Sequence, residues 1–178
     1  HLVEHLAPML DRLVGQDIRL SVELEDDVWP VDADPAPLEE ALLNLAINAR
    51  DAIEGSGRIT ISCRNVAASE RADCDKDHVE IAVLDTGVGM SESVREKAID
   101  PFFTTKPVGK GSGLGLSMVE GYVSQTGGKM HIVSDPGYGT TVSLLMPRAI
   151  TQAVAHPAQI EKSSLGHGES VLVIDDNL

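Results

Sequence analysis

The sequence predicts an α/β domain, because segments with helical periodicity and segments with strand alternation follow one another along the chain. Apolar residues recur at helical spacing over residues 2–14, and Gly15 ends that run. Apolar and polar residues then alternate over residues 18–24, as they do in a half-buried strand. A length of 178 residues suits one domain of ordinary size with an appendage.

A second helix is predicted to begin after Asp34, whose side chain can cap it, with Pro35 at its first position. This helix should extend to about Ile53, where glycines follow. Two strands are then expected, over residues 58–66 and 79–84, with a charged loop between them.

Residues 100–112 are rich in glycine, proline, threonine and lysine and show no periodicity, which predicts a long mobile loop. Long loops inside compact domains are often lids over sites. We expect Phe102 and Phe103 to anchor the hinge of this lid against the core. The rest of the domain is predicted to be a helix and two strands, over residues 114–125, 129–134 and 140–146.

The domain is expected to occupy residues 1–149. Residues 150–169 are rich in alanine, histidine, serine and glycine, which is typical of a linker. Residues 170–178 contain a short run of apolar residues, as in a buried strand, followed by two carboxylates, Asp175 and Asp176.

The charge of the chain excludes some classes of partner. Fourteen basic residues face 28 acidic ones, for a net charge of −14, so neither a nucleic acid nor an anionic membrane is expected as the main partner. No apolar stretch reaches membrane-spanning length, and we expect no direct membrane contact. Cys63 and Cys74 are too few for a metal site or a disulfide framework, so a reducing cytosolic compartment is expected.

Asn44 and Asn48 lie one turn apart on the second predicted helix, on the side opposite its apolar face. An amide oxygen is a neutral hard ligand that suits a Mg²⁺ ion already carrying phosphate oxygens. Taken alone, the pair fits a polar surface stripe better than a metal site, and that alternative stays open.

Asp85 follows a predicted strand and begins a turn with Gly87 and Gly89. A carboxylate there can accept a hydrogen bond from an exocyclic amine, which would favour adenine over guanine. The alternative is an ordinary turn that needs only aspartate and glycine.

A glycine-rich loop stands between the predicted lid and the helix that follows it. It consists of Gly111, Ser112, Gly113, Leu114 and Gly115. Backbone N–H groups at a helix N-terminus can bind phosphate, and glycines let the ligand approach closely. Lys106 and Lys110 flank the loop and can meet phosphate oxygens, although both also suit a solvated lid.

Together these segments resemble the asparagine box, the two glycine boxes and the phenylalanine box of bacterial sensor histidine kinases. The resemblance covers about residues 1–148 in the expected order and spacing. The Asn-Ala-Arg-Asp-Ala and Phe-Phe-Thr-Thr-Lys variants are most similar to the nitrogen-regulation and PAS-containing hybrid kinases. Residues 171–176 resemble the start of a receiver domain, which would make the parent a hybrid kinase.

The resemblance implies a two-layer α/β sandwich of the Bergerat (GHKL) type, in which helices cover one face of a mixed sheet, and it implies ATP and Mg²⁺ as ligands. Asn48 would bind Mg²⁺ with support from Asn44, and Lys106 would join them in catalysis. Asp85 would bind the adenine amine beside Gly87 and Gly89, and Thr141 would support Asp85 through water. The phosphates would be held by Lys110 and by Gly111, Ser112, Gly113, Leu114 and Gly115.

The implied partners are upstream dimerisation helices that carry the phosphoacceptor histidine, a receiver domain, and a second copy of the parent. The parent would act in the cytoplasm, whether or not it is anchored in the inner membrane. Members of this fold that hydrolyse ATP usually place a glutamate four residues before the magnesium asparagine, where this chain has Asn44. Phosphoryl transfer is therefore favoured over hydrolysis. Asn44 and the receiver-like tail count against a Bergerat ATPase or a serine-directed kinase, and the intact motifs count against a nucleotide-sensing module without transfer.

Overall fold

The computed structural model describes residues 2–70, 75–107 and 111–149. The elements are α1 (Leu2–Val14), β1 (Ile18–Leu24), α2 (Pro35–Ala52), β2 (Gly57–Val66), a 3-10 turn η1 (Ala68–Glu70), β3 (His78–Asp85), α3 (Glu92–Arg95), α4 (Gly115–Gln125), β4 (Lys129–Ser134) and β5 (Thr140–Pro147). Each helix and strand predicted in this part of the chain is confirmed to within about two residues. The short helix α3 was not predicted.

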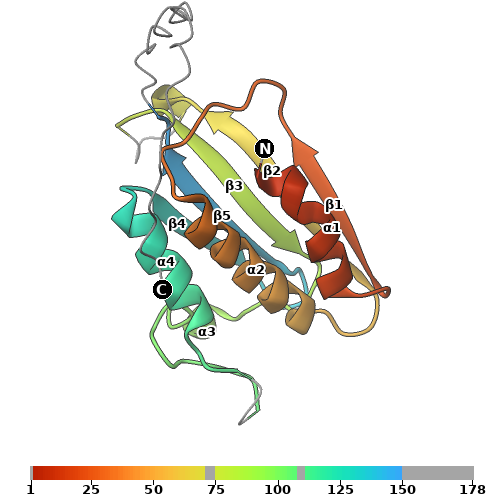
Figure 1. Cartoon of the computed structure of the whole chain (residues 1–178). Helices are drawn as coiled ribbons and strands as arrows, with labels where there is room; N and C mark the ends of the chain where they lie inside the picture. The colour runs from red at the N-terminus through yellow and green to blue at the C-terminus, as the bar shows by residue number, and fades with distance from the viewer. Residues whose placement is uncertain (1, 71–74, 108–110, 150–178) are drawn as a thin grey trace, which may run out of the picture.

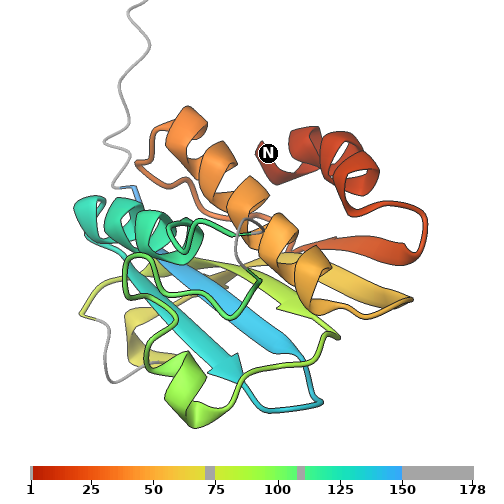
Figure 2. The ribbon, with the colours of Figure 1, turned by 90° about the horizontal axis from the view of Figure 1, so that it is seen from below.

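The strands form one five-stranded sheet in the order β1-β2-β3-β5-β4. β1 and β2 are parallel, while the other neighbouring pairs are antiparallel. α1, α2 and α4 all lie over the same face of the sheet (Figures 1 and 2). The predicted two-layer sandwich with a mixed sheet is thus confirmed.

Local sequence determines where α2, the helix that connects the parallel strands β1 and β2, begins and ends. The carboxylate of Asp34 accepts a hydrogen bond from the Ala36 N–H at 3.2 Å, and Pro35 occupies the first turn, where its missing N–H costs nothing. The helix ends at Ala52, one residue before Ile53 adopts an extended conformation. This end faces the turn that follows β3, since the Val88 N–H donates to the Ala52 carbonyl at 2.9 Å.

The core fills the space between the helices and the covered face of the sheet. Its fully buried large side chains include Leu10, Leu42, Leu45, Ile59, Ile61, Leu144 and Met146. Because side chains alternate along a strand, Asp85 continues the inward-facing row of Val79, Ile81 and Val83. The hydrophobic pattern of β3 thus places a carboxylate at the end of the covered face.

Two predictions about the loop after α3 have different outcomes. Phe103 is half-buried, but the expected anchoring by Phe102 is wrong, because its side chain is 74% exposed. Phe102 has a φ of 69°, and its N–H donates to the Gly113 carbonyl at 2.8 Å. Its contact with the rest of the domain is therefore made by the backbone, and the ring is left in solvent.

Several predicted features lie outside the described residues: Lys110, Cys74, the linker over 150–169 and the strand within 170–178. None of the helices that the structure describes is long and apolar enough to cross a lipid bilayer.

Candidate functional site

Asn44 and Asn48 lie half-buried on α2, on the side that faces the beginning of α4. A Cβ atom built on Gly115 would be 3.5 Å from Asn48 Nδ2 and 3.7 Å from Asn44 Oδ1. The two amides therefore meet the first residue of the helix that follows the glycine-rich loop. The pair is therefore packed against another helix and is not a fully solvated surface stripe.

Asp85 is only 6% exposed. Its Oδ1 accepts the Gly87 N–H at 2.8 Å and the Thr140 N–H at 3.2 Å. Burial raises the pKa of Asp85 above its ordinary value, while these two N–H groups act in the opposite direction. A buried carboxylate with both of these bonds on one oxygen can present its other oxygen, Oδ2, to a ligand donor.

Glycines make the backbone around Asp85 possible. A Cβ on Gly87 would lie 2.6 Å from the Ala52 carbonyl oxygen, and Gly89, with a φ of 68°, would drive one into the Asp135 carbonyl. The turn is also tied to the β4–β5 turn, because the Gly137 N–H donates to the Val88 carbonyl at 2.7 Å. The predicted glycines thus hold the turn between the end of α2 and the β4–β5 turn.

The residue that supports Asp85 from β5 is Thr140, so the prediction of Thr141 is wrong by one position. Thr140 is the register partner of Asp85, whereas Thr141 pairs with Leu84 and Val133. Paired residues share a face, so Thr141 lies on the sheet face opposite Asp85. Ser134, also missed, extends the support: its hydroxyl is 2.9 Å from that of Thr140.

The glycine-rich loop leads directly into α4. Gly113 has a φ of 68°, and a Cβ there would run into the backbone of Phe102. The Leu114 N–H donates to Ser112 Oγ at 3.3 Å, and no side chain caps the helix at Leu114. The N–H groups of the first turn of α4, which have no partners within the helix, are thus available to an anion beside Asn44 and Asn48.

Lys106 brings positive charge to the same place. Its Nζ lies 3.4 Å from Asn48 Oδ1 and 2.7 Å from Asp51 Oδ2. Burial raises the pKa of Asp51, but hydrogen bonds and charges from Lys106 and Arg50 lower it by more, so it lies below its ordinary value. Asp51 was not among the predicted site residues, because its lysine partner is 55 positions away in an aperiodic loop.

The residues fit ATP and a magnesium ion in different ways. A carboxylate oxygen suits the adenine amine, and a helix N-terminus with a lysine suits phosphates. Within the described residues no group of three or more His, Cys, Asp or Glu side chains could hold a metal ion. An amide oxygen such as that of Asn48 suits a Mg²⁺ that takes most of its ligands from phosphates and water.

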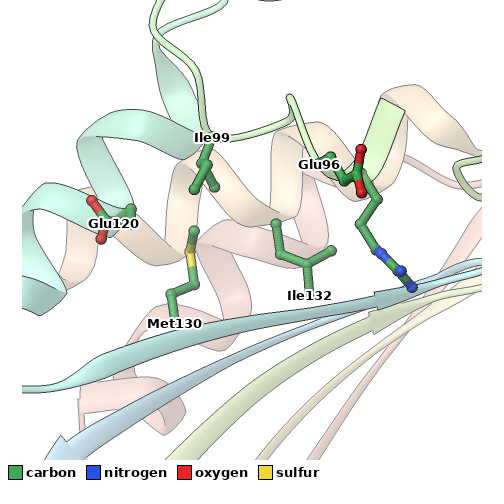
Figure 3. A pocket seen from close by; sticks show the side chains of 6 residues that line it. Glu96, Ile99, Glu120, Met130 and Ile132 are labelled. Carbon is green, nitrogen blue, oxygen red and sulfur yellow. The ribbon is translucent and has the colours of Figure 1, made fainter. Parts of the chain in front are cut away.

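Two pockets of the described structure lie apart from this site. One, of about 270 Å³, lies between α4, β4 and the segment after α3, and its walls include Glu96, Ile99, Glu120, Met130 and Ile132 (Figure 3). The other, of about 370 Å³, lies between α1 and β1. Neither is lined by a predicted site residue, and we assign no ligand to them.

Residues 33–150 match the family described as histidine kinase-, DNA gyrase B- and HSP90-like ATPase. The chain is 43% identical to sensor kinase CckA of Brucella abortus over 96% of its own length and 20% of that relative. It is 37% identical to the signal transduction histidine-protein kinase AtoS of Escherichia coli, over 70% of the chain and 19% of the relative. The chain thus spans about a fifth of the length of these curated relatives.

Solved structures of histidine kinases also resemble this domain. The mycobacterial sensor histidine kinase MprB superposes with a TM-score of 0.67 at 26% identity, over 83% of this chain and 92% of that one. The catalytic domain of histidine kinase ThkA gives a TM-score of 0.62, also at 26% identity, over 83% of this chain and 89% of that one. The chain therefore belongs to the histidine kinase-, gyrase- and HSP90-like ATPase family, as the ATP-binding catalytic domain of a sensor histidine kinase.

Proposed function

We propose that this domain binds ATP·Mg²⁺ and donates the γ-phosphoryl group to a histidine on a dimerisation domain outside this chain, as a step in a phosphorelay. The observation that carries the proposal is the meeting of Asn44 and Asn48 with Gly115, which joins the asparagine helix to the phosphate loop. Phosphoryl transfer depends mainly on positioning and on neutralising charge. The two amides and the loop would supply positioning, and Lys106 beside Asn48 would supply positive charge.

In the proposed complex Asp85 Oδ2 accepts the exocyclic amine of adenine, and the turn that contains Gly87 and Gly89 lies along the ring. The phosphates lie at the N-terminus of α4, where Gly111, Gly113 and Gly115 let the backbone approach. Bound Mg²⁺ would neutralise the phosphates, with Asn48 Oδ1 as its protein ligand. Lys106 adds a further positive charge, and Lys110 is proposed to assist it.

Transfer is favoured over hydrolysis by the identity of residue 44. A hydrolase needs a base to activate water, and the amide of Asn44 cannot accept a proton at any useful pH. Glu40 stands one turn earlier and would restore a base if the motif were shifted by four residues. Glu40 is exposed, and Asn44 and Asn48 are the side chains that approach Gly115, which supports the unshifted register.

We propose a larger parent with an upstream dimerisation domain and a receiver domain that begins near residue 170. The motif over residues 171–176 supports the receiver, and similarity to sensor kinase CckA over 96% of the chain extends beyond residues 33–150. Such a parent would act as a homodimer. Its catalytic domain would lie in the cytoplasm, where ATP is available.

The reaction is tested with the chain extended upstream by ~100 residues, about one small domain. This longer protein is incubated with γ-labelled ATP and Mg²⁺. Acid-labile, base-stable label on the protein is expected, because phosphohistidine has that stability. Label released only as free phosphate, and lost in the Asn48→Asp variant, would instead show an ATPase.

A further inference from the structure

Asp51 lies at the centre of a chain of polar contacts that ends at Lys106. The two oxygens of its carboxylate have different partners. Oδ1 accepts hydrogen bonds from Arg50 Nε at 3.0 Å and Nη2 at 2.7 Å, and Oδ2 accepts one from Lys106 Nζ at 2.7 Å. The carboxylate is therefore held from both sides.

Arg50 is fixed in turn by α1. Its Nη1 donates to the Leu13 carbonyl at 3.2 Å, in the last turn of that helix. A planar guanidinium bound at both ends leaves the Asp51 carboxylate little rotational freedom. The position of Oδ2, and with it the place where Lys106 is held, is thus set by contacts outside the phosphate loop.

Lys106 is bound unequally by its two partners among the described residues. The contact with Asp51 is short and charge-assisted, whereas the contact with the neutral amide of Asn48, at 3.4 Å, is long and weak. An ammonium group has three N–H donors. Lys106 can therefore keep Asp51 while it gives up Asn48, and can still donate to an incoming phosphate oxygen.

We propose that Asp51 is a positioning residue, which keeps Lys106 directed at the phosphates while the ammonium group exchanges Asn48 Oδ1 for a phosphate oxygen. The inference deepens the proposed function and rests on it. The exchange also releases Asn48 Oδ1, the atom proposed as the magnesium ligand. Binding of the phosphates and exposure of the metal ligand are thus two results of one movement of Lys106.

The local charges are consistent with this role. A lone carboxylate beside a triphosphate would repel it, but Asp51 is flanked by Arg50 and Lys106, so the three side chains together carry about one positive charge. In a chain with a net charge of −14, the site needs such a local excess of positive charge. An unattached Lys106 would have to be ordered when ATP binds, and that ordering lowers affinity.

The test is a double-mutant cycle with Asp51→Asn, Lys106→Gln and the double variant, in which ATP and adenosine affinities are measured with Mg²⁺ by titration calorimetry. Asp51→Asn is expected to weaken ATP binding about fivefold, as for a partly exposed ion pair. Adenosine lacks phosphates, so its affinity should not change. In the Lys106→Gln background, Asp51→Asn should have no further effect on ATP.

Asp77→Asn is the matched control, because Asp77 forms a comparable ion pair with Arg148, at 3.2 Å and away from the site. It should leave both affinities unchanged. Asp51→Glu, which keeps the charge, should restore part of the ATP affinity. Thermal unfolding of every variant shows whether the fold is intact.

Three results would overturn the positioning role: ATP binding that is unchanged or tighter in Asp51→Asn, equal losses for ATP and adenosine, or the same loss with and without Lys106. In each of these cases a wild-type domain that binds ATP·Mg²⁺ leaves the proposed function standing. A wild-type domain that binds no ATP would refute both.

Discussion

Replacing Asp85 with asparagine changes one hydrogen-bonding atom at the proposed adenine site and leaves its backbone partners in place. The Gly87 and Thr140 N–H groups both donate to Oδ1, so in the variant they select the amide oxygen for that position. The amide nitrogen must then replace Oδ2. The NH₂ group of the asparagine, a hydrogen-bond donor, would then face the amine of adenine, which is also a donor, in place of the acceptor Oδ2.

The size of the effect follows from the bond that is lost. A hydrogen bond to a charged group contributes about 1.5–3 kcal/mol, and a buried donor without a partner adds about 1 kcal/mol or more. The sum is about 3 kcal/mol, so ATP should bind roughly 100-fold more weakly. Guanine carries an acceptor oxygen at the corresponding position, so the preference for ATP over GTP should also fall.

Titration calorimetry of the wild-type and Asp85→Asn domains with ATP·Mg²⁺ and GTP·Mg²⁺ measures both quantities. Asp77→Asn, the same substitution away from the site, serves as the control. Because the variant removes a buried charge, its melting temperature at neutral pH should equal or exceed that of the wild type. A folded Asp85→Asn domain with unchanged ATP affinity would refute the adenine assignment.

Three further predictions concern other parts of the site. Replacing Asn48 with alanine should reduce the gain in ATP affinity produced by Mg²⁺ by about tenfold or more, measured across a Mg²⁺ titration, since loss of even an indirect ligand commonly has that effect. Replacing Gly113 with alanine should lower stability by about 1–3 kcal/mol in denaturant unfolding, because alanine is strained at a φ of 68° and its Cβ meets the Phe102 backbone. The third prediction is that Asp85→Asn becomes more stable relative to the wild type as pH rises. The pKa of Asp85 is raised in the folded state, so its contribution to wild-type stability is complete below the unfolded pKa and is lost as pH rises through the folded pKa. Melting temperatures from about pH 4 to pH 7 test this, and parallel curves would contradict it.

Local signals explain what could be predicted from the sequence. The boundaries of α2 follow from Asp34, Pro35 and the glycines beyond Ile53, which act within a few residues of the helix ends. The glycine-rich loop and the turn after Asp85 could be located for the same reason: backbone that closely approaches its surroundings requires glycine wherever the rest of the chain lies.

The failed predictions depended on contacts between distant segments. Thr140 and Thr141 are adjacent and chemically identical, and only the register of β5 against β3 decides which of them meets Asp85. Phe102 was expected to anchor the hinge of the loop against the core. Its backbone is instead bonded to Gly113, eleven positions along the chain, and no periodicity in the loop indicates that bond.

The same contacts show that the proposed adenine site opposes stability. Gly139 has a φ of 82°, and a Cβ there would meet the Asp85 carbonyl, so the β4–β5 turn depends on glycine to approach this strand end. The hydrophobic row of β3 would accept an apolar residue at position 85, which would avoid the cost of a buried charge. The two N–H bonds to Oδ1 offset only part of that cost, since the pKa of Asp85 remains raised. Both backbone N–H groups donate to Oδ1, which leaves Oδ2 of this buried carboxylate for another donor. We therefore infer that position 85 keeps its carboxylate for a ligand that donates a hydrogen bond to it.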